Sequence, residues 1–255
     1  MEEYILATHA RDVLGATLDS FVRTIHLPIS MLTFVQEKLL QQLTTKRGRR
    51  ETEMFVIEGE KFVRDAGGLV EFTFTPADTA RFAEYVSTET PQGFAAVARI
   101  PKVTMKRFAE SATIVVLDGV QDPGNVGTIL RAALGFGASV LLVESAEVTN
   151  PKVVRASASA ILRTPWMMVA REDAGAIIAS FCRPVYRLEL RDGALLPNDI
   201  RPEPCVVIAG SEGGGITLPV AGTSIAIPHN PALESLNVGV ATSIILYERS
   251  RQLAV

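Results

Sequence analysis

A glycine-rich loop between two apolar segments is the part of the chain best suited to hold a ligand. The apolar segment 205–209 ends at Gly210, and the loop that follows carries three consecutive glycines and one acid, Glu212. Glycines let another group approach the backbone closely. A phosphate would favour basic neighbours and the loop has none, so we expect an uncharged or cationic ligand. A flexible turn without a ligand is the alternative.

A second polar loop follows the next apolar segment. That segment reaches Ile227, and the loop brings Ser235, Leu236 and Asn237 to the start of a long apolar helix. Ligands of open parallel sheets bind outside the carboxyl ends of the strands. We therefore expect the two loops to form one site that holds its ligand largely through backbone groups. Helix capping is the alternative role for Ser235 and Asn237.

Asn125 and Arg131 form a third polar group. A strand ends at Asp118, a turn follows, and Asn125 is expected to cap a helix that runs to about Gly135. Arg131 lies roughly 9 Å further along that helix. Helical side chains lean toward the N-terminus, so we expect its guanidinium to reach back toward the loop. Simple capping and a surface position are the alternatives, and no phosphate-binding or dinucleotide fingerprint is present.

The composition is that of a folded domain and excludes several classes of protein. Of the 255 residues, 47% are hydrophobic and 21% are charged, and the net charge is −3. No apolar run of about 18 residues occurs, and the acidic start differs from a secretory signal, so we expect no membrane span. Two cysteines and three scattered histidines predict neither a metal site nor a disulfide scaffold, and favour a cytoplasmic location.

The apolar periodicity predicts two α/β domains that meet near residue 108. Residues 31–107 form the smaller one, which begins with a helix over 31–43 and a basic turn over 45–50. In residues 108–255 we expect strands at 113–118, 139–143, 166–170, 185–190 and 205–209, and helices at 125–135 and 173–181, with another beginning at Asn150-Pro151. Continuous apolar strands alternating with helices predict a parallel sheet covered on both faces. Residues 1–30 are an extension of unknown role.

Positive charge is concentrated in two places. Five basic residues and no acid lie between Lys38 and Arg50, and four basic residues and no acid lie between Arg99 and Arg107. Such clusters are compatible with an RNA partner, and a solvated surface is the alternative.

Taken in order, the motifs resemble the SpoU (TrmH) family of RNA ribose 2′-O-methyltransferases. The matching motifs are NxGxxxR at 125–131, GSEGxG at 210–215 and IP…SLNVxVAxxIxLYE at 227–248, and the segment 152–160 also fits. The resemblance covers about 110–255, and residues 31–100 are similar to that family's L30e-like RNA-binding module. One departure is Gly239, where the family often has serine, and we expect it to affect only helix packing.

The resemblance implies a catalytic domain with a C-terminal trefoil knot that binds S-adenosylmethionine and works as a homodimer. The apolar last helix also predicts a partner subunit. The implied cofactor contacts are Gly210, Ile227 and Leu236, and the implied catalytic set is Asn125, Arg131, Glu212, Ser235 and Asn237. The predicted RNA contacts are Lys46, Arg47, Arg49 and Arg50, and no metal is implied.

The implied reaction is attack of a ribose 2′-hydroxyl on the cofactor methyl. A free guanidinium keeps its proton at physiological pH, so we expect Arg131 to stabilise developing negative charge or bind a phosphate rather than act as a base. The extra N-terminal module favours ribosomal RNA of the large subunit over transfer RNA. A non-catalytic RNA-binding protein and a small-molecule transferase are the alternatives from other classes.

Overall fold

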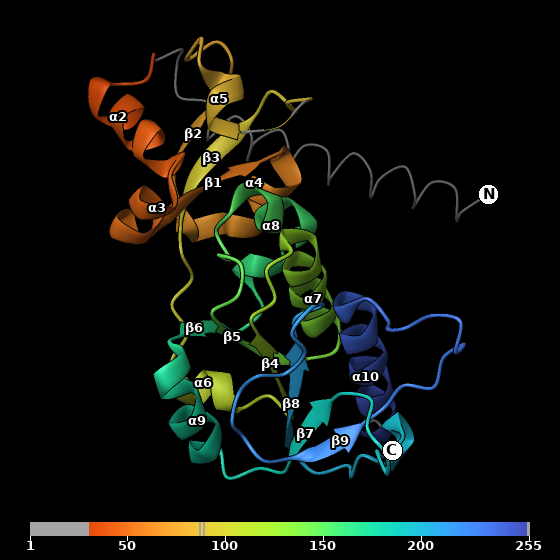
Figure 1. Cartoon of the computed structure of the whole chain (residues 1–255). Coiled ribbons are helices and arrows are strands. Elements are labelled where there is room, and N and C mark those ends of the chain that lie inside the picture. The colour runs from red at the N-terminus through yellow and green to blue at the C-terminus, as the bar shows by residue number, and fades with distance from the viewer. Residues whose placement is uncertain (1–30, 87, 89, 254–255) are drawn as a thin grey trace, which may run out of the picture. The chain divides into compact units, whose positions relative to one another are not determined.

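The computed structural model describes residues 31–86, 88 and 90–253 (Figure 1). Its contacts divide the chain into two compact units. Within the described residues, one unit is built from 31–63 together with Val70–Ala98, and the other from Arg64–Leu69 together with 99–253. The predicted extension 1–30 lies outside the described residues. Among the described residues, no helix has both the length and the apolar content needed to cross a membrane.

The first unit contains a three-stranded sheet with the order β1-β3-β2, in which β2 and β3 are antiparallel. The strands are β1 (Met54–Glu58), β2 (Val70–Phe74) and β3 (Ala95–Arg99), and the helices are α2 (Phe34–Leu43), α3 (Lys46–Thr52), α5 (Phe82–Val86) and the first part of α4 (Glu60–Ala66). Apolar side chains of α2 and α5 pack against the sheet around Phe74. This unit has the α/β arrangement that was expected, with an additional helix where the sequence pattern indicated a basic turn.

That additional helix is α3, and it corrects the prediction of a basic turn. Thr45 caps α3 by accepting a hydrogen bond from the Gly48 N–H, and a Cβ at Gly48 would lie 1.9 Å from the carbonyl oxygen of Gln42. The glycine therefore lets α3 begin directly against the end of α2. Arg49 is buried, and its Nη1 donates to the carbonyl of Leu43 at 2.9 Å. The last carbonyls of a helix lack partners within the helix, and Arg49 satisfies one of them. Arg49 is thus held inside the first unit, unlike its neighbours Lys46, Arg47 and Arg50, and its predicted contact with RNA stays a prediction.

The second unit is organised around a six-stranded sheet with the order β6-β5-β4-β8-β7-β9. Every neighbouring pair in it is parallel. The strands are β4 (Thr113–Asp118), β5 (Ser139–Val143), β6 (Trp166–Val169), β7 (Val185–Leu188), β8 (Cys205–Gly210) and β9 (Thr223–Ile225). Strands β4 and β8 lie side by side in the middle and are almost completely buried, as continuous apolar runs require in a sheet covered on both faces. The predicted parallel α/β sheet is confirmed.

Helices cover both faces of this sheet (Figure 1). They are α6 (Met105–Ala109), α7 (Pro123–Gly135), α8 (Pro151–Ala156), α9 (Arg171–Ser180) and α10 (Val238–Leu253). On one face, Phe108 of α6 and Ile178 of α9 pack against β4, β5 and β8. On the other face, Ile245 of α10 packs against Val207 of β8 and Ile225 of β9, and α10 also packs along α7.

Helix α7 begins earlier than predicted, and this changes the role of Asn125. Asp122 is the N-cap, and its Oδ1 accepts a hydrogen bond from the Asn125 N–H at 2.8 Å. Pro123 at the first helical position suits this start because its fixed φ is preorganised for a helix. Asn125 is therefore not the cap, and its side chain is available for other contacts.

Gly127 allows α7 and α8 to pack closely. A Cβ at this position would lie 2.4 Å from the Ala156 Cβ and 2.9 Å from the Ser157 nitrogen. Helix packing thus explains the glycine of the 125–131 motif. The close contact between α7 and α8 also sets the position of Asn125, which lies two residues earlier in α7.

We predict that Gly127→Ala lowers the free energy of unfolding by about 1–3 kcal/mol, because the added methyl group has no space. Gly135→Ala is the matched control, since a Cβ at the end of the same helix meets no atom within 4 Å. That variant should leave stability unchanged or raise it by up to about 1 kcal/mol. Urea unfolding followed by circular dichroism measures both, and equal effects would contradict the packing argument.

Candidate functional site

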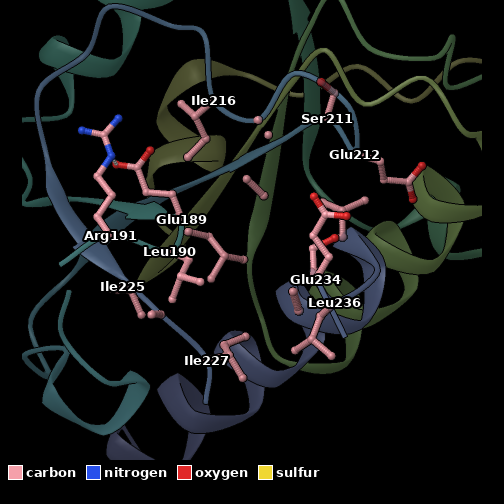
Figure 2. A pocket seen from close by; sticks show the side chains of 18 of the residues that line it. Glu189, Leu190, Arg191, Ser211, Glu212, Ile216, Ile225, Ile227, Glu234 and Leu236 are labelled. Atoms are coloured by element: carbon pink, nitrogen blue, oxygen red, sulfur yellow. Dashed lines mark ion pairs between the residues drawn. The ribbon is translucent and has the colours of Figure 1, made fainter. Parts of the chain in front are cut away.

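A pocket of about 400 Å³ lies at the carboxyl ends of β7, β8 and β9 (Figure 2). Its walls come from residues 188–191, the glycine-rich loop after β8, residues 225–227 with His229, and residues 234–236 with Val238 and Ala241. The two polar loops singled out in the sequence thus line the same cavity. A volume of this size is typical of small-molecule sites.

The three residues predicted to contact a cofactor, Gly210, Ile227 and Leu236, all line this pocket, and so do Glu212 and Ser235. The wall also contains two further glutamates, Glu189 and Glu234, against one arginine, Arg191. This surplus of acidic side chains disfavours a phosphate and suits an uncharged or cationic ligand.

The glycine-rich loop closes on itself. Ser211 and Gly215 exchange two backbone hydrogen bonds, at 3.1 and 2.9 Å, and Gly215 has a φ of +62°. A Cβ on Gly210 would lie 2.1 Å from the backbone of Gly215, so only glycine allows this closure. The result is a small turn that presents Glu212 to solvent and to the pocket.

Asp118 anchors the chain directly behind this loop. Its side chain is fully buried at the end of β4, and its Oδ2 accepts from the backbone N–H groups of Thr217 at 2.5 Å and Leu218 at 2.7 Å. Its Oδ1 accepts from Arg171 Nη2 at 2.8 Å, and Arg171 Nε donates to Glu144 at 2.7 Å. These hydrogen bonds to Glu144 and Asp118 raise the pKa of Arg171 further above its ordinary value.

Sequence reasoning did not assign a role to Asp118 or Arg171. An acid at the end of a buried strand was the available signal, since such a carboxylate needs partners. The partners themselves lie 53 and 99 residues away along the chain, and only the fold brings them together.

Three of the predicted polar residues form a hydrogen-bonded cluster beside the pocket. Asn125 Nδ2 donates to Glu212 Oε1 at 2.5 Å, and Asn237 Nδ2 donates to Asn125 Oδ1 at 2.9 Å and to Glu212 Oε1 at 3.3 Å. The Glu212 side chain therefore belongs both to this cluster and to the pocket wall.

Asn237 has a second role, because its Oδ1 caps α10. That oxygen accepts from the N–H groups of Gly239 at 2.9 Å and Val240 at 3.2 Å. A Cβ on Gly239 would lie 3.2 Å from Asn237 Oδ1 and 3.3 Å from Asn125 Oδ1. Gly239 thus borders the polar cluster directly, and a side chain at this position would contact both asparagines.

Arg131 does not join the cluster. Its side chain is exposed on α7, and it makes no hydrogen bond or ion pair with any residue in the described part of the chain. The expected reach of its guanidinium back to the loop is not seen. Six positions along an α-helix turn the side chain about 240° from Asn125, so the two residues lie on different faces.

The end of β7 supplies a wall residue that sequence reasoning missed. Glu189 accepts from Arg187 Nε at 3.0 Å and from Ser224 Oγ at 2.9 Å. Burial alone would raise the pKa of Glu189, but the hydrogen bonds from Arg187 and Ser224 outweigh it, and the pKa lies below its ordinary value. The side chain is therefore ionised at neutral pH.

The basic residues predicted to contact RNA lie on α3. Lys46, Arg47 and Arg50 are exposed, and Arg47 pairs with Glu51 at 2.7 Å. An exposed pair of this kind is worth little energy, so Arg47 can exchange Glu51 for another anion.

Comparison with known proteins identifies the family. The model of the SpoU rRNA methylase family matches residues 112–247, which hold the pocket and the polar cluster. The chain belongs to this family.

Members of the family and solved structures resemble the chain over most of its length. It is 31% identical over 235 residues to the 23S rRNA (guanosine(2553)-2′-O)-methyltransferase RlmP of Bacillus subtilis, covering 81% of this chain and 92% of that protein. The structure of an AdoMet-bound rRNA methyltransferase from Sinorhizobium meliloti matches with a TM-score of 0.77 and 27% identity, over 88% and 97% of the two chains. A putative RNA methyltransferase of the TrmH family from Porphyromonas gingivalis matches with a TM-score of 0.72 and 30% identity, over 87% and 99%.

We predict that Asp118→Asn lowers the free energy of unfolding by about 2–3 kcal/mol, since a buried acceptor of several hydrogen bonds is replaced by a group that also donates. Hydrogen exchange at the Thr217 and Leu218 amides should accelerate, because asparagine has one acceptor oxygen for partners that now use two, these two N–H groups and Arg171.

Glu144→Gln is the matched control for this variant. It removes only the more exposed partner of Arg171 and should change stability by less than about 0.5 kcal/mol. Unaltered amide exchange in Asp118→Asn would contradict the anchoring role.

Proposed function

We propose that this chain is an S-adenosylmethionine-dependent methyltransferase that modifies a ribose 2′-hydroxyl of ribosomal RNA, of the large-subunit (23S) type. The observation that carries the proposal is that Glu212 is shared between a small-molecule pocket and a hydrogen-bonded cluster with Asn125 and Asn237. A protein that only binds RNA has no use for such a cluster next to a pocket. Family membership and the names of the relatives agree with this chemistry.

The residues of the pocket fit S-adenosylmethionine. Ile225, Ile227 and Leu236 offer apolar walls for an adenine, and the backbone at Gly210 offers neutral hydrogen-bonding groups. The surplus of glutamates suits a sulfonium cation. When bound, the cofactor supplies a methyl group that its positively charged sulfur already activates.

The protein's own task is then to hold the attacking hydroxyl and its proton. Asn125 and Asn237 occupy Oε1 of Glu212, and Oε2 accepts no hydrogen bond from these two side chains. We assign Glu212 Oε2 to the hydrogen of the ribose hydroxyl, which orients the oxygen toward the methyl group. Ser235 lines the pocket and is assigned to holding the cofactor loop.

Arg131 is assigned to RNA rather than to the cluster. Its exposed guanidinium, without a partner in the described part of the chain, is free to bind the phosphate next to the target ribose through two parallel hydrogen bonds. Lys46, Arg47 and Arg50 on α3 are assigned to RNA further from the reacting ribose.

Three finer structural features belong to the same proposal. The trefoil knot is supported by the path of the chain, which passes from the central strand β8 to the edge strand β9 and returns as α10 onto α7 and β8.

An L30e-like RNA-binding role for residues 31–107 is supported by the α/β arrangement and the exposed cations of α3. A homodimer is supported by the exposed apolar side chains of Phe136, Val240 and Tyr247 on α7 and α10. Two unpaired cysteines favour the cytoplasm.

The decisive experiment incubates the purified chain with labelled S-adenosylmethionine and unmodified transcripts of 23S rRNA, 16S rRNA and transfer RNA. We expect label only in 23S rRNA, at one ribose that resists alkaline cleavage. Label in transfer RNA alone would show that transfer RNA, and not 23S rRNA, is the substrate. Absence of cofactor binding by calorimetry would remove the enzymatic proposal altogether.

We predict that Arg131→Lys lowers kcat/KM for RNA about tenfold or more at pH 7, because an ammonium cannot bind a phosphate with two parallel hydrogen bonds. The affinity for S-adenosylmethionine should not change. Arg163→Lys, at another exposed arginine of the same unit, is the control and should retain activity. Near-normal turnover in Arg131→Lys would exclude the assigned role.

We predict that Asn237→Asp separates the capping of α10 from the cluster. The remaining oxygens still cap the helix, but the amide donor is lost and a second carboxylate lies about where Asn237 Nδ2 is, 3.3 Å from Glu212 Oε1. The unfolding temperature should change little, while turnover falls at least about tenfold.

Asn230→Asp adds the same charge to the same loop outside the pocket, and it should remain active. Equal losses in both variants would show that added charge alone, rather than the broken cluster, causes the defect.

A further inference from the structure

The end of β7 forms a wall of the pocket that lies outside the three sequence motifs. Leu188, Glu189, Leu190 and Arg191 all line the cavity. Figure 2 shows Glu189 and Arg191 on one side of the pocket and Glu212 on the other. A ligand that reaches from Glu212 across the cavity therefore meets the β7 wall with its far part.

The Glu189 carboxylate is held in one position by residues behind it. Arg187 Nε and Ser224 Oγ both donate to Oε1, and the side chains of Arg187 and Glu189 are only 11% and 15% exposed. Arg187 is fixed in turn, because its Nη1 donates to the carbonyls of Leu218 at 3.2 Å and Val220 at 2.7 Å. A group held in this way needs no reordering when a ligand binds.

One oxygen of this carboxylate has unused capacity. Oε1 accepts two hydrogen bonds, from Arg187 Nε and Ser224 Oγ, and also forms an ion pair with Arg191 Nε at 3.2 Å. Oε2 receives only Arg187 Nη2, at a long 3.3 Å. A carboxylate can accept about four hydrogen bonds in total, and each oxygen has room for two. Oε2 is therefore the acceptor that remains open to a ligand.

The charges around Glu189 select the kind of donor. Two guanidinium groups, of Arg187 and Arg191, already lie against its single negative charge. A third cation such as an ammonium would be repelled by them, whereas a neutral hydroxyl donor would not. A fixed acid that binds ribose hydroxyls is a known solution in nucleotide sites on parallel sheets.

We infer that Glu189 binds the ribose hydroxyls of the cofactor through Oε2, as a specificity-determining residue supplied by the end of β7. The inference rests on the proposed function, since it takes S-adenosylmethionine as the ligand. It adds a side chain to a site that the motifs describe mainly through backbone contacts, and it explains why an ionised acid lies between the leucines of this wall.

The test compares three ligands with the full-length chain and its Glu189→Gln variant by calorimetry. The ligands are S-adenosylmethionine, 5′-methylthioadenosine, which keeps the ribose but lacks the amino acid, and 5′-methylthio-2′,3′-dideoxyadenosine, which lacks both ribose hydroxyls. We expect Kd to rise about tenfold or more in Glu189→Gln for the first two, because a charged acceptor is lost. The dideoxy ligand should bind the unmodified chain weakly and be insensitive to the substitution.

Ser224→Ala is the structural control. It removes one donor behind Glu189 but leaves Oε2 in place, so it should lower the unfolding temperature slightly and change Kd less than about twofold. If Ser224→Ala weakened binding as much as Glu189→Gln does, the role of Glu189 would be to support the wall and not to contact the ligand. The inference would then fail.

The remaining outcomes separate the inference from the proposed function. No binding of any adenosine ligand by the unmodified chain would overturn the proposed function. Normal binding together with an unaffected Glu189→Gln variant would overturn only the inference. Loss of affinity for S-adenosylmethionine with unchanged affinity for 5′-methylthioadenosine would place the ammonium at Glu189 and also overturn it.

Discussion

The buried carboxylate of Asp118 is the constraint on which the site depends. It lies at the end of the central strand β4 and binds two consecutive backbone amides of the chain that leaves the glycine-rich loop. A buried charge must be fully paired or hydrogen-bonded. The segment around Thr217 and Leu218 can therefore occupy only one position against Asp118. Because the loop is attached to it on one side and to β8 on the other, the position of Glu212 follows from these hydrogen bonds.

The polar cluster is built from three side chains, and two of them have two roles each. Glu212 faces the pocket and accepts from two asparagines, and Asn237 both caps α10 and fixes Glu212. Hydrogen bonds thereby connect both α10 and the glycine-rich loop to the cluster of Asn125, Glu212 and Asn237. A site built in this way is sensitive to the packing of α7, since Gly127 decides how closely α7 approaches α8 and hence where Asn125 lies.

Local pattern was sufficient where burial on both faces decided the structure. Strands β4 and β5 begin and end at the predicted residues, because continuous apolar runs between turns have one stable place in a parallel sheet. The sequence pattern gave wrong expectations where contacts with another residue or segment determine the local structure. The segment Lys46–Thr52 is a helix because Gly48 fits against α2, Arg49 is buried because the end of α2 needs a donor, and Asp122 takes the cap that Asn125 was expected to provide.

The sequence alone determined the parallel α/β sheet, the family and five residues of the pocket wall, because these depend on periodicity and on short motifs. Only the tertiary structure decided which polar residues meet. Asn125, Glu212 and Asn237 come together, Arg131 remains apart on another face of α7, and Asp118 and Glu189 acquire partners that no spacing indicated. The physical reason is that a hydrogen bond depends on positions within a few tenths of an ångström, and those positions are set by packing between segments up to about a hundred residues apart.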